Sequence, residues 1–221
     1  MKAIILAAGR GERLRPLTDT IPKPLVDVGG QALIHHHLNN LAAAGVTEVV
    51  INVSWLGDQI EQALGSGDRF GVKIEYSREP VGALETAGGI IAALPLLGND
   101  PFLMISADVF CDYPLAQLRN HALDGLGHLV MVNNPAHHPE GDFAIAQSGK
   151  LVRGGSRLTF SGMAILHPDL FADWTPQRRP LRPVLEKALL DQSLTGELYE
   201  GIWSDVGTPE RLAEIRARLE S

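Results

Sequence analysis

Short runs of apolar residues alternate with amphipathic, helix-like segments along the whole sequence. Runs such as residues 102–106 are nearly continuous in apolar residues, which is typical of strands covered on both faces. The alternation of strands and helices in the first half favours a largely parallel sheet with right-handed crossovers. We expect strands at residues 2–6, 48–53, 72–76, 102–106, 128–132, 142–146, 159–166 and 198–203.

Helices are expected at residues 32–44, 56–64, 86–94, 115–121, 183–190 and 209–219. Gly45 would end the first helix as a C-terminal cap, and Thr208 followed by Pro209 would start the last one. In the second half a glycine-rich, partly basic loop separates two expected strands, so antiparallel strands are predicted there. The predicted fold class is α/β: a single Rossmann-like domain over residues 1–221, with a mixed, mostly parallel sheet flanked by helices.

Charge and composition narrow the class of ligand and the compartment. The chain has 19 Lys and Arg against 26 Asp and Glu, a formal net charge of −7. A duplex nucleic-acid binder needs a basic face, so no nucleic acid is expected, although a locally positive pocket can still bind a small anion. No apolar stretch approaches the ~18 residues of a membrane span. Cys111 is the only cysteine and the N-terminal apolar run is too short for a signal peptide, which favours a cytoplasmic location.

A loop rich in glycine and arginine follows the first expected strand. It contains Gly9 and Gly11, and Arg13 and Arg15 come directly after. Glycines let backbone N–H groups approach an anion closely, and arginines bind phosphate oxygens in pairs. Open α/β sheets bind ligands at this carboxyl edge. Leu14 breaks the G-x-G-x-x-G pattern and no Gly-Lys-Ser/Thr follows, so this is neither a dinucleotide fingerprint nor a Walker loop. A plain glycine turn with solvated arginines is the alternative.

Lys23 stands between Pro22 and Pro24, shortly after this loop. Because proline fixes its own φ, the lysine is presented from a stiff backbone, as suits a cation that holds polyphosphate. The whole string from Leu6 to Leu25 reads Leu-Ala-Ala-Gly-x-Gly-x-Arg-Leu-x-Pro-Leu-Thr, followed by Pro-Lys-Pro-Leu. It resembles the signature of the sugar-1-phosphate nucleotidylyltransferases.

The resemblance implies a GT-A-like nucleotidyltransferase fold, with a nucleotide-binding part in residues 1–110 and a sugar-phosphate-binding part in residues 111–221. In that family the glycine loop wraps a nucleoside triphosphate and the lysine contacts its phosphates. Glu85 would orient a hydrogen bond near the base and Gly88 would leave room for a backbone contact; an ordinary helix start capped by Thr86 is the alternative. The residues assigned to the nucleotide are Ala8, Gly9, Gly11, Glu12, Arg13, Lys23, Glu85, Gly88 and Ser106.

Asp108 and Asp205 match the two carboxylates that bind metal in the family, although Ala107 replaces the glycine that usually precedes the first. Taken singly, each aspartate is compatible with a cap or turn. Mg²⁺ is usually bound by one or two carboxylates together with substrate phosphates. The implied cofactor is therefore Mg²⁺, held by these two aspartates. The resemblance assigns catalysis to Arg13, Lys23, Asp108 and Asp205.

Shorter strings narrow the resemblance to the uridylyltransferases of this family that act on N-acetylmuramic acid 1-phosphate in cell-wall recycling. They are Trp55-Leu56-Gly57, Leu94-Pro95-Leu96-Leu97-Gly98, Asn134-Pro135-Ala136-His137-His138, Gly141-Asp142-Phe143 and Thr159-Phe160-Ser161-Gly162. This similarity implies UTP and a sugar 1-phosphate as substrates, with Asp142, Gly162 and Trp203 binding the sugar phosphate. The compact length makes a monomer the expected state.

One family element is missing. Many relatives carry a Glu-Lys-Pro tripeptide whose lysine meets the sugar phosphate, and this sequence has no such tripeptide. Lys150, Arg153 and Arg157 lie in the corresponding region without aligning to it. The sequence therefore does not say which cation neutralises the sugar phosphate.

The implied reaction is attack by an oxygen of the sugar 1-phosphate on the α-phosphorus of UTP, with release of pyrophosphate. A phosphate monoester has a second pKa of about 6 and is mostly a dianion at neutral pH, so no general base is needed. Catalysis would consist of in-line positioning and charge neutralisation. Lys23 and Arg13 would stabilise the pyrophosphate.

Other features look reactive but have simpler interpretations. His35, His36 and His37 are consecutive, and on a helix such side chains do not converge, which argues against a metal cluster. A solvated loop is favoured for His137 and His138 over a substrate role. Cys111 is expected to be structural, and the arginines at positions 178, 179 and 182 are expected in a plain surface loop rather than a mobile lid.

Three other functions stay open. One is nucleotidylyl transfer to a glucose-, mannose- or amino-sugar 1-phosphate from UTP, dTTP, GTP or CTP. Another is a non-catalytic nucleotide-sugar sensor, which the intact Lys23, Asp108 and Asp205 disfavour. The third is a glycosyltransferase of related fold, which is disfavoured because the sequence after Asp108 does not form an Asp-x-Asp motif.

Overall fold

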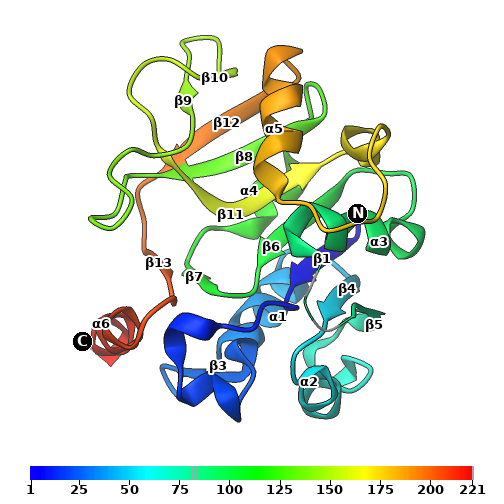
Figure 1. Cartoon of the computed structure of the whole chain (residues 1–221), viewed down its shortest axis with the longest axis vertical. Helices are drawn as coiled ribbons and strands as arrows, with labels where there is room; N and C mark the ends of the chain where they lie inside the picture. Colours follow the sequence, from blue (N-terminus) through cyan, green and yellow to red (C-terminus); the bar gives the residue numbers. More distant parts are fainter. Residues whose placement is uncertain (81, 83, 221) are drawn as a thin grey trace.

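The computed structural model of the chain describes residues 1–80, 82 and 84–220 and is built around one sheet of seven strands (Figure 1). The strands lie in the order β12-β8-β11-β6-β1-β4-β5. They are β1 (Ala3–Leu6), β4 (Glu48–Val53), β5 (Lys73–Arg78), β6 (Phe102–Ser106), β8 (Gly127–Val132), β11 (Thr159–Leu166) and β12 (Leu194–Tyr199).

The other strands form three two-stranded sheets. They pair β2 (Asp27–Val28) with β3 (Gln31–Ala32), β7 (Val109–Cys111) with β13 (Trp203–Asp205), and β9 (Ala144–Ile145) with β10 (Leu151–Val152). The helices are α1 (Leu33–Ala43), α2 (Gly57–Leu64), α3 (Glu85–Leu97), α4 (Leu115–Asn120), α5 (Leu181–Leu190) and α6 (Pro209–Glu220). Short 3-10 turns at Glu12–Leu14, Leu17–Asp19 and Lys23–Leu25 shape the glycine-rich loop and the segment after it.

The direction of the strands confirms the predicted mixed, mostly parallel sheet. β1 pairs in parallel with both β4 and β6, and β5 adds in parallel to β4. β11 runs antiparallel to its two neighbours, β6 and β8, and β12 is again parallel to β8. The single reversed strand lies in the second half of the chain, where the alternation of strand and helix breaks down.

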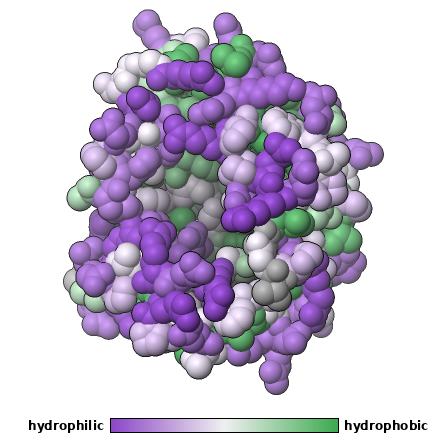
Figure 2. All heavy atoms as spheres, in the orientation of Figure 1, coloured by the Kyte–Doolittle hydropathy of each residue, from purple (hydrophilic) through white to green (hydrophobic). Residues whose placement is uncertain are grey.

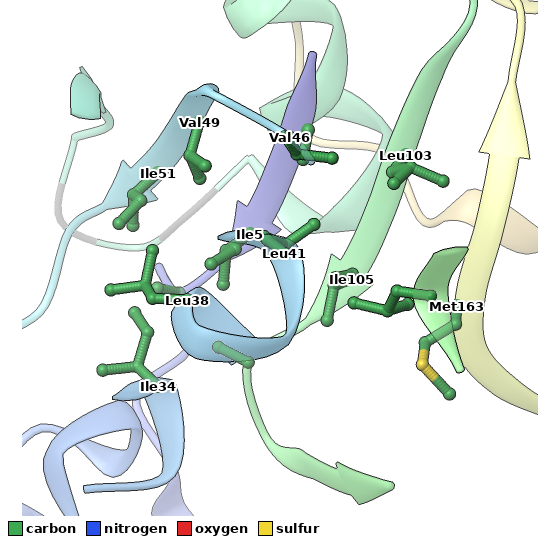
Figure 3. Packing of buried hydrophobic residues seen from close by; sticks show 14 of the residues in the cluster. Ile5, Ile34, Leu38, Leu41, Val46, Val49, Ile51, Leu103, Ile105 and Met163 are labelled. Atoms are coloured by element: carbon green, nitrogen blue, oxygen red, sulfur yellow. The ribbon is translucent and has the colours of Figure 1, made fainter. Parts of the chain in front are cut away.

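Alternate residues of the central strands bury their side chains on opposite faces of the sheet, as the strand period requires. Ile5 lies in the apolar cluster that contains Ile34, Leu38 and Leu41 of α1 (Figure 3). Its neighbour Ile4 lies in the other cluster, with residues of α3 and α5. A third cluster packs α6 against the segment that follows the glycine loop, and it holds Leu14, Val28, Leu33, Phe110, Val206, Leu212 and Ile215. The C-terminal helix is therefore fixed beside the glycine loop.

Three predicted elements differ from the structure. The strand predicted at 198–203 is wrong: β12 ends at Tyr199 and β13 begins at Trp203. The carboxylate of Asp112 causes the break, because its Oδ1 accepts hydrogen bonds from the Ile202 N–H at 2.7 Å and the Tyr199 hydroxyl at 2.5 Å. The helix predicted at 86–94 begins at Glu85 and continues through Pro95 to Leu97, so Thr86 is not its cap. In the strand predicted at 142–146, only Ala144–Ile145 forms ladder pairs.

Both predicted helix signals near Gly45 and Thr208 are confirmed. Gly45 follows α1 with φ +77°, the left-handed conformation that glycine adopts at low cost. The Thr208 hydroxyl accepts from the Arg211 N–H at 3.4 Å at the start of α6. Over the described residues, no helix is long and apolar enough to cross a membrane.

Candidate active site

A pocket of about 490 Å³ opens at the carboxyl ends of β1, β4, β5 and β6. Parallel strands place their ligand sites at this edge because the loops that follow them converge there. Figure 2 shows that the molecular face presented in Figure 1 is hollowed, with mainly hydrophilic residues around the hollow. The predicted site residues that line the pocket are Ala8, Gly9, Gly11, Glu12, Arg13, Lys23, Glu85, Ser106 and Asp108.

The glycine loop is held against the segment that carries Lys23. Gly11 has φ +67°, and a Cβ there would lie 3.0 Å from Thr18 Cγ2 and 3.2 Å from Lys23 Cβ. The Thr18 hydroxyl donates to the Gly11 carbonyl at 2.8 Å, which closes the loop. At Gly9, by contrast, a Cβ would meet nothing within 4 Å. The loop is thus anchored on one side and leaves open space beside Gly9 in the pocket.

A buried polar network beneath the loop was missed by the sequence interpretation. Asn52, at 3% exposure, accepts from the Ala7 N–H at 2.6 Å and donates to Glu79 Oε1 at 2.7 Å. The other oxygen of Glu79 accepts from the Leu84 N–H at 3.1 Å. The network ties β1, β4, β5 and the start of α3 together at the pocket. Its only sequence signal is a lone asparagine in an otherwise apolar strand.

Lys23 and Asp108 form an ion pair on the pocket wall. Lys23 is buried, and its Nζ lies 2.7 Å from Asp108 Oδ2. Burial opposes ionisation of Asp108, but the ammonium of Lys23, a backbone hydrogen bond and the nearby Arg13 outweigh it and hold the pKa of that carboxyl below its usual value. Asp108 is therefore ionised at neutral pH. Prolines on both sides place Lys23 at the start of a 3-10 turn with its side chain directed inward.

Asp205 reaches the same place from the other end of the chain. β13 pairs antiparallel with β7 so that Asp205 lies opposite Val109, and the Val206 N–H donates to the Asp108 carbonyl at 2.8 Å. The two predicted metal ligands are therefore brought close together, Asp108 directly before β7 and Asp205 at the end of β13. Arg211 Nη1 donates to both oxygens of Asp205, at 2.9 and 2.8 Å. His137 Nε2 lies 3.2 Å from Asp205 Oδ1.

The chemistry of these two groups fits Mg²⁺. Over the described part of the chain, no cluster of three or more His, Cys, Asp or Glu side chains is arranged to hold a metal. Asp108 lines the pocket, whereas Asp205 does not line it but lies beside Asp108 through the pairing of β13 with β7, and each carboxylate is paired with a cation of the chain. Mg²⁺ characteristically takes one or two protein carboxylates and completes its coordination with water and substrate phosphates. A site with two carboxylates fits that preference.

The three residues predicted to bind the sugar phosphate gather around the start of β11. Asp142 Oδ2 accepts from the Phe160 N–H at 2.9 Å, and the Trp203 indole N–H donates to the Ser161 carbonyl at 2.9 Å. Gly162 has φ +84°, and a Cβ there would lie 2.8 Å from the hydroxyl oxygen of Ser106. β11 is irregular in this stretch, since its pairing with β8 shifts between Phe160 and Ala164. Asp142, Phe160–Gly162 and Trp203, which we call the acceptor side because the sequence assigns them to the sugar phosphate, thus adjoin the pocket at Ser106.

Gly88 does not line the pocket. A Cβ at Gly88 would lie 2.3 Å from the Gln177 carbonyl oxygen. Its N–H donates at 3.2 Å to the Arg179 carbonyl, which also accepts from Ala87 at 3.0 Å. The backbone contact that Gly88 permits is therefore made by the protein itself. Its assignment to the nucleotide stays a prediction without support from this geometry.

The arginine-rich loop lies on the surface, as predicted, but it is docked by backbone hydrogen bonds, and Arg182 belongs to α5 rather than to the loop. In addition to the bonds from Ala87 and Gly88, the Arg179 N–H donates to the Leu84 carbonyl at 2.8 Å. Arg178 Nε lies 2.9 Å from Glu85 Oε1, and the Arg179 guanidinium stacks on Trp174 at 4.2 Å. The loop is docked on the first turn of α3, beside the pocket.

The histidines divide into two groups. His35, His36 and His37 have separate surroundings: His35 packs on Phe70, His36 on Phe110, and His37 is buried in the core with its pKa lowered to about 4 by that burial. His137 and His138 lie in an exposed loop, as predicted, and each also has a carboxylate of the site within reach. His137 contacts Asp205, and His138 Nε2 lies 3.3 Å from Asp142 Oδ1.

Three further residues named in the sequence analysis do not line the pocket. Cys111 is buried in β7, and burial raises the pKa of its thiol to about 12, in line with a structural role. Lys150 and Arg153 are engaged away from the pocket, Lys150 with Asp124 at 2.7 Å and Arg153 with Glu186 at 3.8 Å.

Comparisons with known proteins agree with this geometry. The nucleotidyl transferase family model matches residues 2–153. An N-acetylmuramate alpha-1-phosphate uridylyltransferase of Neisseria meningitidis serogroup B is 49% identical over 98% of this chain and 97% of its own. Its counterpart in Caulobacter vibrioides is 34% identical over 98% of this chain and 96% of its own. A mannose-1-phosphate guanyltransferase of Emericella nidulans is 37% identical, and this chain spans 62% of its length.

Solved structures share the fold. A Bacillus anthracis protein assigned as a glucose-1-phosphate thymidylyltransferase superimposes with a TM-score of 0.87 at 24% identity, covering 100% of this chain and 96% of its own. HddC from Yersinia pseudotuberculosis, in complex with GMP-PN, superimposes with a TM-score of 0.79 at 21% identity and 98% coverage of both chains. At these identities the likeness concerns the fold. With the family model and the full-length relatives, the resemblance expected from residues 6–25 is confirmed: the chain belongs to the nucleotidyl transferase family.

Proposed function

We propose that this chain transfers the uridylyl group of UTP to the phosphate of N-acetylmuramic acid α-1-phosphate, giving UDP-N-acetylmuramic acid and pyrophosphate. The observation that carries the reaction type is the pair of carboxylates beside a glycine loop and a buried lysine: Asp108 directly precedes β7, and Asp205 ends β13, which pairs with β7. The choice of base and sugar rests on the uridylyltransferase from Neisseria, which is 49% identical over nearly the full length of both chains.

The bond changes in this reaction balance without a general base. An oxygen of the sugar phosphate forms a bond to the α-phosphorus of UTP. The bond from that phosphorus to the oxygen bridging to the β-phosphorus breaks, and pyrophosphate leaves with the electron pair. The attacking phosphate has a second pKa of about 6, so it is already largely a dianion at neutral pH. The protein therefore has to position the reactants in line and neutralise charge.

Residues on the nucleotide side are placed for this task. The anchored glycine loop leaves space beside Gly9 for the triphosphate, and Arg13 and Lys23 line the same pocket. Cations directed at the leaving pyrophosphate stabilise the charge that develops on it. Asp108 and Asp205 would hold Mg²⁺, which when bound supplies Lewis-acid neutralisation of the phosphate oxygens. Lys23 and Arg211 orient the two carboxylates through their ion pairs.

Both substrate sides are built from one chain, so we propose that a monomer suffices for activity. The single cysteine, Cys111, is buried and needs no partner, as suits the reducing conditions of the cytoplasm. Size-exclusion chromatography with light scattering at the enzyme concentration of the assay checks the first statement. Activity from a species of twice the chain mass alone would contradict it.

The test is pyrophosphate release from UTP in the presence of Mg²⁺, with four acceptors compared: the 1-phosphates of N-acetylmuramic acid, N-acetylglucosamine, glucose and mannose. We expect release with the muramic sugar at a kcat/KM at least tenfold above the others, and loss of release when EDTA removes the metal. Stronger release with mannose 1-phosphate and GTP would instead follow the guanyltransferase relatives. No release with any acceptor or triphosphate would favour a non-catalytic sensor.

A further inference from the structure

The cation that binds the sugar phosphate is not identified by the sequence, and the structure offers one. Arg211 lies in the first turn of α6, next to Asp205 at the end of β13 and His137 in the loop after β8. His137 Nε2 lies 2.5 Å from Arg211 Nη1. Three segments far apart in the sequence thus converge at the carboxylate predicted to hold the metal. None of them belongs to the signature at residues 6–25.

Arg211 is largely buried beside Asp205 and is not a solvent-exposed surface charge. Its side chain is only 13% exposed, and its Nε atom is buried with no hydrogen-bond partner among the described residues. A buried guanidinium with an unmet donor is costly, because the donor has lost its hydrogen bonds to water. This cost is accepted within the fold, and the Nη2 atom is the part of the group that faces the pocket at Gly207.

The charge around Gly207 also points to an anion. Gly207 lines the pocket, and a Cβ there would lie 2.2 Å from Arg211 Nη2 and 3.1 Å from Arg13 Nη2. Two guanidinium groups therefore flank one glycine. Like charges this close repel unless an anion lies between or beside them. Asp205 balances Arg211 through Nη1 only, which leaves the Nη2 side of the group directed at Gly207.

Three other candidate cations already form ion pairs with carboxylates of the chain. Lys150 and Arg153 pair with Asp124 and Glu186 away from the pocket, and Lys23 is bound to Asp108. Arg157 is exposed on the loop near Asn134, which donates to its carbonyl at 2.9 Å, and it is the remaining competitor.

We propose that Arg211 binds the phosphate of the sugar 1-phosphate and that His137 lies beside this anion, so that the C-terminal helix supplies the cation that relatives carry in their Glu-Lys-Pro element. This inference rests on the proposed function, because it takes a sugar phosphate as the acceptor. Arg211 forms its bond to Asp205 through Nη1 and directs Nη2 at the acceptor phosphate. Its guanidinium suits a phosphate, which it can bind with two parallel hydrogen bonds.

The test compares Arg211→Gln, Arg211→Lys, Arg157→Gln and the matched control Arg216→Gln. Arg216 lies on the same helix and donates to the Asp27 carbonyl, away from the pocket. For R211Q we expect the KM for the sugar 1-phosphate to rise 10- to 100-fold, in the range of a lost charge-assisted hydrogen bond, with the KM for UTP changed less than threefold. R211K should recover part of the loss. R216Q and R157Q should behave like the unaltered enzyme.

A binding measurement separates recognition from a merely structural role. The sugar 1-phosphate is titrated calorimetrically into enzyme saturated with Mg²⁺ and a UTP analogue that has methylene in place of the α,β-bridging oxygen. R211Q should weaken this binding by the factor seen in KM, while the affinity for the analogue itself stays unchanged.

Three outcomes would overturn the inference. Equal losses for UTP and sugar phosphate in R211Q would mean that Arg211 only holds Asp205 in place. A rise in the sugar-phosphate KM in R157Q in place of R211Q would move the site to the loop. If the unaltered enzyme releases no pyrophosphate with any sugar phosphate, the proposed function fails and this inference fails with it; an active enzyme with an unaffected R211Q contradicts the inference alone.

Discussion

The nucleotide side and the acceptor side of this site are built in different ways. On the nucleotide side, Gly9, Gly11 and Lys23 lie within one short stretch, and local backbone geometry puts them in place. On the acceptor side, Asp142, Gly162 and Trp203 come from three distant segments that are held by side chains bonded to the backbone of β11. One side is a local motif and the other is a product of tertiary structure.

This difference indicates which substitutions should disturb each side of the site. A loop fixed by its own turns depends on its own residues, Gly11 above all, and on the buried network of Asn52 beneath it. A side assembled from distant segments depends on each single hydrogen bond that joins them. The two sides meet at the Asp108 and Asp205 strand ends, where one antiparallel pairing joins the first half of the chain to the second.

The largest effect is expected where the two sides meet. Asp108→Asn and Asp205→Asn should each lower kcat about 1000-fold, the scale of losing a charge that stabilises the transition state. Circular dichroism and thermal unfolding should show an intact fold. Asp124→Asn, at an ion pair with Lys150 away from the pocket, is the control. Near-normal turnover in either site variant would remove that aspartate from the metal site.

The next effect concerns the foundation of the nucleotide side. Asn52→Ala leaves the Ala7 N–H and the Glu79 carboxylate without their shared partner in a buried place. Unfolding in urea should show a loss of about 1–3 kcal/mol, and the KM for UTP should rise more than that for the sugar phosphate. Ser54→Ala, which loses an exposed bond to the Pro80 carbonyl, should change neither quantity appreciably. Equal stability of N52A and S54A would show that the network does not support the loop.

A smaller effect should appear on the acceptor side alone. Gly162 and Gly30 both have φ +84°, but only at Gly162 would an added Cβ meet the Ser106 side chain, at 2.8 Å. Alanine at either position should cost about 1 kcal/mol of stability for the left-handed backbone. Only Gly162→Ala should also raise the KM for the sugar phosphate, by about tenfold (1.4 kcal/mol). A similar KM change in Gly30→Ala would mean that strain, rather than contact, is being measured.

The smallest effect is expected at the docked loop. The Arg178–Glu85 ion pair has an Arg178 side chain that is 74% exposed, and such pairs contribute about 0–1 kcal/mol. Arg178→Gln should therefore leave the KM for UTP within about threefold, because backbone bonds from Arg179 hold the loop on α3. Hydrogen exchange at Ala87 and Gly88 reports docking directly. Fast exchange there in R178Q would show that the ion pair, and not the backbone, holds the loop.

The same contrast explains what the sequence could and could not predict. The sheet follows from the alternation of apolar strands and amphipathic helices. The signature residues assigned to the nucleotide, from Ala8 to Lys23, line the pocket as predicted. Gly88 was assigned to the nucleotide because nothing in its own segment shows that Gln177 covers it. His137 is an exposed loop residue, as predicted, but its contacts with Asp205 and Arg211 could not be predicted, because these partners come more than sixty residues later in the sequence. The break between β12 and β13 depends on one carboxylate, Asp112, from another strand region.

The central claim is that the acceptor phosphate attacks the α-phosphorus of UTP and takes the uridylyl group. The direct measurement uses UTP labelled at the α-phosphorus, incubated with Mg²⁺, N-acetylmuramic acid 1-phosphate and the enzyme, with the products separated by chromatography. We predict that the label appears in UDP-N-acetylmuramic acid and that pyrophosphate carries none. Label found in free UMP, or left in UTP after prolonged incubation, would contradict the account.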